Sequence, residues 1–279
     1  MGNRALEELA RRAASGDSEA LSRLVEEVQH PVYRLALRFL GHPEDAKDAS
    51  QEILVRLVTN LGSFEGRSQF MTWVYAVAVR QLMRTRKRQI ESSVKGAESF
   101  AAFLDQGLAD RDFTAEEAEY RLLCAEVRIS CTYGMLLCLS RPLRAAYILG
   151  DAMGLSDIVA AEICEISRAA HRQRLARARR TVRDIIAHRC GLVDAANPCR
   201  CGRQIEGSLA AGIMDREQLL FAQHPRNDSG PIETGTIERA ANQLDLALAM
   251  GEVYRSDPSF AAPREVWERL QAACPDLLA

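Results

Sequence analysis

The chain has 279 residues, of which 27% are charged and 47% hydrophobic, and its formal net charge is −2. This length suits about two domains of roughly 150 residues each. No run approaches the roughly 18 consecutive apolar residues of a membrane-spanning helix, and the charged N-terminus lacks the apolar core of a signal peptide. Composition therefore argues against a membrane protein and predicts a soluble, cytoplasmic one.

Apolar residues recur with the 3.6-residue period of an α-helix, and no segment alternates convincingly as a strand would. The pattern predicts an all-α fold. The expected helices are 3–14, 18–40, 43–61, 68–88, 115–138, 141–152, 156–163, 167–187, 215–222, 236–254 and 264–273. Loops are expected at 191–207 and 223–235.

The expected helix 43–61 carries an acidic stripe opposite its apolar face. Asp45, Asp48 and Glu52 follow the i, i+3, i+7 spacing, so they lie on one side of the helix. Such a stripe is either a solvated surface or a docking face for a basic partner. The residues alone leave both interpretations open.

The expected helix 68–88 places a tryptophan beside a row of cations. At about 100° per residue, one narrow arc contains Trp73, Arg80, Arg84 and Lys87. Binding of single-stranded DNA uses this combination, with a ring that stacks on bases and cations that contact phosphates. A lone tryptophan also commonly belongs to a helical core, so the stripe by itself is a weak signal.

Charge is unevenly distributed along the rest of the chain. The stretch between the two basic segments, ESFAAFLDQGLADRDFTAEEAEY, is mainly acidic, whereas SRAAHRQRLARARR at 167–180 is strongly basic. Two basic segments joined by an acidic connector predict two nucleic-acid contacts on two small domains.

Residues 140–186 carry the helix-capping signals of a helix-turn-helix. Ser156 and Ser167 are suitable N-caps for two short helices, the second of which is basic. In this motif the second helix enters the major groove. His171 falls on the face expected to be buried, and the outward candidates for base and phosphate contacts are Arg168, Arg172, Gln173 and Arg177.

Two stretches resemble the extracytoplasmic-function sigma factors of the sigma-70 family. Residues 5–88, with PEDAKDASQEILVRLV and FEGRSQFMTWVYAVAV, are similar to region 2 of that family, and 119–187, with LSRPLRAAYILGDAMGLSDIVAAEI, are similar to region 4. Each motif is moderately specific, but their order along one chain is a strong signal.

The resemblance implies binding to core RNA polymerase, through the β′ clamp helices and the β flap, and recognition of promoter DNA. An anti-sigma factor is a further candidate partner, and no catalytic residue is implied. The residues that match the core-binding motif are Asp45, Asp48, Gln51 and Glu52. Those matching the region that opens the −10 element are Phe64, Arg67 and Trp73. Those matching the −35 recognition helix are Arg168, Arg172, Gln173, Arg174 and Arg177. The acidic linker would thread the polymerase channel that later carries RNA.

Three features depart from the family pattern. Glu165 stands where the family often has a turn glycine, which predicts a turn that is strained or differently shaped. His171 replaces a usual aliphatic residue, and Val79 and Arg80 replace the familiar Arg-Asn after the region 2 tryptophan. These departures concern the promoter sequence more than the activity.

The tail contains an H-x-C…C-x-C set formed by His188, Cys190, Cys199 and Cys201. Thiolate and imidazole ligands suit Zn²⁺ or Cu⁺, so zinc or copper is a candidate cofactor of the extension. Promoter recognition itself requires none. A C-x-C pair is less typical of structural zinc than C-x₂-C, and reduced or redox-active cysteines are the alternative.

The predicted organisation has four parts: region 2 at 1–88, an acidic linker at 89–118, region 4 at 119–187 and a metal-binding or regulatory extension at 188–279. The leading hypothesis is a sigma factor regulated by its extension. The alternative is a helix-turn-helix regulator with a metal- or redox-sensing tail that never joins polymerase. The acidic face and the Trp–Arg stripe favour the first, because a simple regulator needs neither.

Overall fold

The computed structural model describes residues 2–86, 91, 96–110, 113–114, 116–222, 224, 251, 253–255 and 257–275. The regular elements in these ranges are helices, and β-structure is limited there to isolated bridges such as the one between Cys190 and Cys199. The all-α prediction is confirmed. Within the same ranges, every helix is too short or too polar to cross a bilayer.

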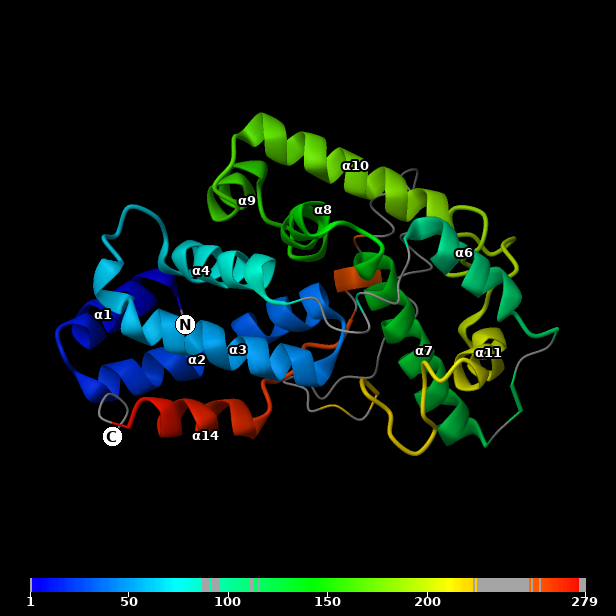
Figure 1. Ribbon diagram of the computed structural model, residues 1–279, viewed down its shortest axis with the longest axis horizontal. Coiled ribbons are helices and arrows are strands. Elements are labelled where there is room, and N and C mark those ends of the chain that lie inside the picture. Colours follow the sequence, from blue (N-terminus) through cyan, green and yellow to red (C-terminus); the bar gives the residue numbers. More distant parts are fainter. Residues whose placement is uncertain are drawn as a thin grey trace.

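The N-terminal part is a bundle of four helices that are consecutive in the chain (Figure 1). Its elements are α1 (Asn3–Ala14), α2 (Ser18–Leu40), α3 (Pro43–Thr59), the 3₁₀ turn η1 (Leu61–Ser63) and α4 (Phe70–Arg84). The Asp17 side chain caps α2 by accepting the Ala20 N–H at 3.0 Å. Gly41, at φ 71°, ends α2 in the left-handed conformation that favours glycine.

The second part of the chain contains α6 (Ala97–Gln106), α7 (Glu117–Leu137), α8 (Arg141–Tyr147), the π-helical turn η2 (Ile148–Ala152), α9 (Asp157–Ile163) and α10 (Arg168–Ile186). Ser156 accepts the Val159 N–H at 3.3 Å, and Ser167 accepts the Ala170 N–H at 3.1 Å. The two predicted N-caps are confirmed. They start the two helices of the helix-turn-helix.

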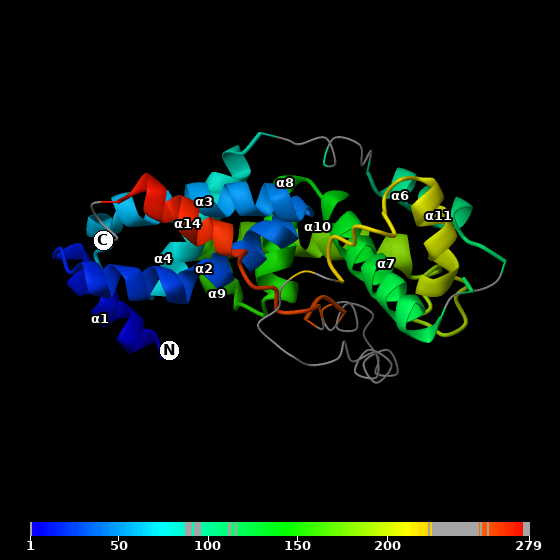
Figure 2. The same cartoon turned by 90° about the horizontal axis from the view of Figure 1, so that it is seen from below.

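The extension adds the 3₁₀ turn η3 (Cys201–Gln204), α11 (Ile205–Ala210) and α14 (Arg264–Ala273). α11 lies beside α7, whereas α14 returns to the far end of the molecule, where it lies against α3 and α2 in both views (Figures 1 and 2). The last described helix therefore packs on the first part of the chain.

Three segments differ from the sequence prediction, and one is the loop expected at 191–207, which contains η3 and the start of α11. The expected linker contains α6, because Ala101 and Leu104 give it a buried face that packs on α7 and α10. The helix expected at 215–222 is wrong: the Glu126 carboxylate accepts backbone N–H groups from 220–222 at 2.7–2.9 Å, which holds the chain in turns. The helix expected at 236–254 lies mostly outside the described residues.

Arg144 ties the first part of the chain to the second. Its side chain is buried, at 1% exposure, and donates to the carbonyl groups of Phe39 at 2.7 Å, Leu136 at 3.0 Å and Leu139 at 3.0 Å. The Phe39 and Leu136 carbonyls belong to the ends of α2 and α7, where helical partners are missing, and Leu139 lies two residues beyond α7. Glu91 balances the charge at 3.1 Å. One apolar core consequently runs through both parts.

Candidate nucleic-acid and protein interfaces

The acidic stripe lies on the outer face of α3. Asp48, Gln51 and Glu52 line one shallow hollow of about 600 Å³, together with Val55 and Arg56. Asp45 is half-buried one turn earlier on the helix. Glu52 is held in place because Gln81 Nε2 donates to its carboxylate at 2.6 Å. The helix thus gathers the four predicted core-binding residues on one side.

Three aromatic rings pack together where η1 leads into α4. Phe64 meets Phe70 edge-on at 5.1 Å and Trp73 at 5.7 Å, measured between ring centroids. Phe70 is buried, whereas Phe64 and Trp73 are half-buried. Trp73 is therefore both a core contact and a surface ring, so the two sequence interpretations of this residue are compatible.

A small pocket of about 220 Å³ opens beside Trp73. Its cations are Arg56, Arg80 and Arg84, and Asn60 and Ser63 add polar groups. An aromatic wall with cations and hydrogen-bonding side chains suits an unstacked nucleobase and its phosphate. Arg67 is exposed outside this pocket and pairs with Glu65. Lys87, the last member of the predicted stripe, lies outside the described residues.

α10 presents most of its basic side chains to solvent. The predicted −35 contacts Arg168, Arg172, Gln173 and Arg177 are exposed, and Arg174 is half-buried. His171 is fully buried, as predicted. Asp157, at the start of α9, pairs with Arg168 at 3.1 Å and with Arg172 at 3.4 Å. These weak, exposed pairs are easily exchanged for phosphate contacts.

The turn between α9 and α10 contacts α4. Glu165 occupies this turn at φ 55°, and among the described residues no other non-glycine residue has a positive φ. The predicted strain is confirmed, because a side chain disfavours this conformation. The Glu165 carboxylate pairs with Arg80 of the Trp73 pocket. The two candidate DNA-binding surfaces are thus joined to each other.

The cysteines of the extension do not form a metal-binding group. In the described part of the chain, no three His, Cys, Asp or Glu side chains are placed to hold a metal ion. Cys190 and Cys199 lie on paired backbone segments, whereas His188 is exposed. Burial raises the pKa of the Cys190, Cys199 and Cys201 thiols and so disfavours the thiolates that a metal needs. The four residues do not fit a metal in this arrangement, and the zinc or copper prediction has no geometric support.

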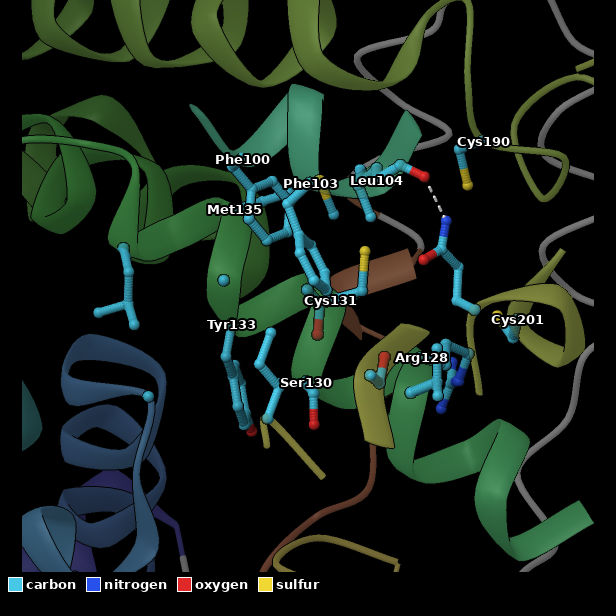
Figure 3. Close-up of a pocket in the computed structure, with 18 of the residues that line it drawn as sticks. Phe100, Phe103, Leu104, Arg128, Ser130, Cys131, Tyr133, Met135, Cys190 and Cys201 are labelled. Atoms are coloured by element: carbon cyan, nitrogen blue, oxygen red, sulfur yellow. Dashed lines mark hydrogen bonds between the residues drawn. The ribbon is translucent and has the colours of Figure 1, made fainter. Parts of the chain in front are cut away.

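Three of these cysteines instead line a cavity of about 450 Å³ between α6, α7 and the extension. Figure 3 shows Phe100 and Phe103 on one side of the cavity, Cys190 and Cys201 on the other, and Cys131 between them. The walls of this cavity come from segments far apart in the chain, so no local pattern marks it.

The C-terminal segment bridges both parts of the chain. We call the described residues 251, 253–255 and 257–275 the C-terminal clasp. On the helix-turn-helix side, the Tyr254 hydroxyl donates to the Thr132 carbonyl at 3.1 Å. In addition, Arg255 Nη1 donates to the Asp151 carbonyl at 2.7 Å. Asp257 is buried, accepts from the Thr132 hydroxyl at 3.1 Å and faces Arg128 at 3.8 Å.

On the other side, the clasp reaches α2 and α3. The Ala262 N–H donates to His30 Nδ1 at 2.9 Å. Val266 and Leu270 are fully buried on one face of α14. Arg269 pairs with Asp48 at 3.2 Å. One of the predicted core-binding carboxylates is therefore already occupied by the chain's own C-terminal helix, which the sequence analysis did not predict.

Comparison with known proteins identifies the family. Residues 24–90 match the family model Sigma-70 region 2. The RNA polymerase sigma-H factor of Pseudomonas aeruginosa is 30% identical over 182 residues, which cover 63% of this chain and 91% of that protein. The ECF RNA polymerase sigma-E factor of Escherichia coli K12 is 30% identical over 178 residues, covering 62% of this chain and 90% of that protein.

Among solved structures, CnrH in complex with the cytosolic domain of CnrY has a TM-score of 0.48 and 21% identity, over 66% of this chain and 97% of that one. The two sequence relatives match over nearly their whole lengths at 30% identity. The chain belongs to the extracytoplasmic-function sigma factors of the sigma-70 family.

Proposed function

We propose that this sigma factor joins core RNA polymerase through the acidic face of α3 and directs it to promoters. It acts in the cytoplasm, where polymerase and promoter DNA are found, and we assign it no catalytic reaction of its own. The observation that carries the proposal is the combination on one chain of an acidic docking face, an aromatic–basic pocket and an exposed arginine helix. A plain helix-turn-helix regulator needs only the last of these.

The polymerase contact is assigned to Asp45, Asp48, Gln51 and Glu52. The hollow beside the last three can accept a basic or apolar side chain from a partner helix, and the carboxylates supply electrostatic complementarity to the β′ clamp helices. Region 4 would add the contact with the β flap. An anti-sigma factor would compete with polymerase for the same α3 face.

Promoter DNA is assigned to two surfaces. The pocket beside Trp73, with Arg80 and Arg84, would hold an unstacked base of the −10 element and its phosphates, with Phe64, Arg67 and Lys87 flanking it. The residues that would read and hold the −35 element are Arg168, Arg172, Gln173, Arg174 and Arg177.

We infer that both proposed DNA surfaces cannot act at once in this arrangement. The two promoter elements are roughly 25 base pairs apart, or about 85 Å at 3.4 Å per base pair. α10 has 19 residues and is therefore about 28 Å long. Arg80 touches Glu165 only three residues before α10 begins. The two parts must separate before they can contact both elements.

We propose that the C-terminal clasp holds the two parts in their closed state, in which the two DNA surfaces are in contact. The clasp contacts both parts and pairs Arg269 with Asp48. The extension is then an internal inhibitor: while it is docked, it holds the DNA surfaces together and occupies part of the polymerase face. Activation requires that the clasp leave α3.

A charge-exchange experiment tests this proposal. Asp48→Arg with Glu52→Arg should abolish co-purification with core polymerase while helical content is unchanged. Arg269→Asp alone should increase co-purification, because it removes the internal competitor. Combining Arg269→Asp with Asp48→Arg restores the internal pair but should not restore polymerase binding.

Undiminished polymerase binding by the Asp48→Arg, Glu52→Arg variant would contradict the assignment of the α3 face. Promoter DNA binding without any association with polymerase would instead favour the plain regulator.

A further inference from the structure

The cavity between α6, α7 and the extension has the properties of a ligand site. At about 450 Å³ it falls within the range of small-molecule pockets. Aromatic walls come from Phe100, Phe103, Tyr133 and Phe221. The first two rings lie 6.4 Å apart and the last two 5.0 Å apart, which leaves planar surfaces for a third ring.

The charge state of the lining limits the chemistry of the ligand. Burial raises the pKa of Cys131, as it does for the other cavity thiols, so the sulfur atoms are neutral and soft rather than anionic. Arg128 is balanced by Asp257 at 3.8 Å. A site without net charge and with apolar walls selects a neutral molecule.

Gln204 contributes a polar atom to the wall that is available to a ligand. Gln204 is 2% exposed, and its Nε2 donates to the Leu104 carbonyl at 2.6 Å, as the dashed line in Figure 3 shows. This bond fixes the orientation of the amide, so Oε1 faces away as an acceptor. Within the described part of the chain, Oε1 is buried and has no hydrogen-bond partner. A buried acceptor without a donor is costly, and a ligand N–H or O–H would satisfy it.

We propose that this cavity binds a neutral, aromatic small molecule that carries one hydrogen-bond donor, with the donor on Gln204 Oε1 and the ring between the phenylalanines and the cysteine thiols. The site adds a sensory function to the sigma factor, and its existence does not depend on the proposed polymerase contact.

The cavity is physically connected to the C-terminal clasp. Val253, a clasp residue, forms part of the wall. Thr132 and Arg128 line the cavity and also hold Asp257. Because the wall is complete only while the clasp is docked, a ligand binds the docked state more tightly and shifts the equilibrium toward it. The ligand is therefore a co-inhibitor, an effect that rests on the proposed function.

The test uses the full chain and the fluorescent probe N-phenyl-1-naphthylamine, which is neutral and aromatic and has a single N–H. We expect saturable binding with increased fluorescence. Its ether analogue, 1-phenoxynaphthalene, has nearly the same shape but no donor, and should compete about fivefold more weakly, the equivalent of one neutral hydrogen bond. Gln204→Leu should remove the difference between the two compounds.

A matched pair of variants locates the binding site. Cys131→Phe places a ring inside the cavity and should abolish probe binding. Cys124→Phe adds the same ring to α7 two turns earlier, where the residue does not line the cavity, and should leave binding intact. Thermal unfolding by circular dichroism verifies that each variant is folded.

The proposal is overturned if the probe does not bind saturably, if both cysteine variants bind it equally well, or if the ether binds as tightly as the amine. Bound probe should also decrease co-purification with core polymerase, and Arg269→Asp should weaken this decrease. Probe binding without any polymerase association would leave the site standing and refute the proposed function alone.

Discussion

Glu165 gives the turn between α9 and α10 both a strained backbone conformation and a negative charge. Its φ of 55° is costly for a side chain, whereas glycine adopts it freely. We expect Glu165→Gly to raise the free energy of unfolding by about 1 kcal/mol, because the exposed pair with Arg80 contributes less than the strain costs. Urea unfolding measures the change. Glu165→Gln is the control, since it removes the charge and retains the strain; a stabilisation of equal size in both variants would contradict this account.

Asp257 makes docking of the clasp sensitive to pH. Burial raises its pKa from the ordinary 3.8 to about 6. A carboxyl group with a raised pKa favours the folded state below pH 4, and this contribution is lost as the pH rises through 6. This difference in pKa between the unfolded and folded states corresponds to roughly 3 kcal/mol of stability.

His30 and His224 give stability the opposite dependence on pH. Burial lowers the pKa of each imidazole, so the folded state loses stability as the pH falls below 6.5. The contribution of Asp257 to the pH dependence of stability is therefore measured as the difference in stability between the wild type and Asp257→Asn. We expect thermal midpoints recorded between pH 4 and 7 to fall more steeply with rising pH in the wild type. Parallel curves would show that Asp257 does not titrate in this range.

At the scale of single elements, α6 and α7 are in close contact at Gly134. A Cβ atom at this position would come within 2.6 Å of the Phe100 ring. Alanine would gain about 1 kcal/mol of helix propensity over glycine, but the clash must displace α6 at a cost of about 1–3 kcal/mol. We therefore expect Gly134→Ala to lower the thermal midpoint and Gly134→Ala with Phe100→Leu to recover part of the loss. An increase in the single variant would mean that α6 is free to shift.

Helices that are marked by apolar periodicity or by a capping residue in their own sequence were predicted correctly. The bounds of α2, α1 and α14 follow from periodicity, and the caps of α9 and α10 follow from Ser156 and Ser167. The sequence could not predict α6 from its acidic surroundings, because its apolar residues acquire a partner only in the folded chain. It predicted a helix at 215–222 that the Glu126 carboxylate, about ninety residues earlier, prevents.

The candidate sites divide in the same way. Spacing alone placed Asp48 and Glu52 on one face and Trp73 beside Arg80. It could not find Arg269 on Asp48 or Glu165 on Arg80, since those pairs depend on tertiary packing. For the same reason it grouped four potential ligands, including His188 and Cys199, that the fold does not gather around a metal.

At the scale of the whole molecule, the proposed mechanism requires that the clasp hold the two parts together. Leu270 is fully buried on α14, whereas its neighbour Gln271 is exposed. We expect Leu270→Glu to release α14, because burying a charge without a partner costs several kcal/mol, and to increase the radius of gyration measured by small-angle X-ray scattering. Gln271→Glu adds the same charge on the exposed side and should not change it. An unchanged radius in both variants would show that other contacts hold the parts together.

Under the proposed mechanism, the inhibitory clasp is covalently part of the sigma factor itself. A tethered segment meets its binding face at an effective concentration in the millimolar range, whatever the number of copies in the cell. Dilution or overproduction therefore leaves the docked fraction of the sigma factor unchanged, whereas a separate inhibitor must be made in matching amounts. A cell can accumulate this protein in its docked form, and the amount of active sigma factor then follows the signal that releases α14 rather than the rate of synthesis.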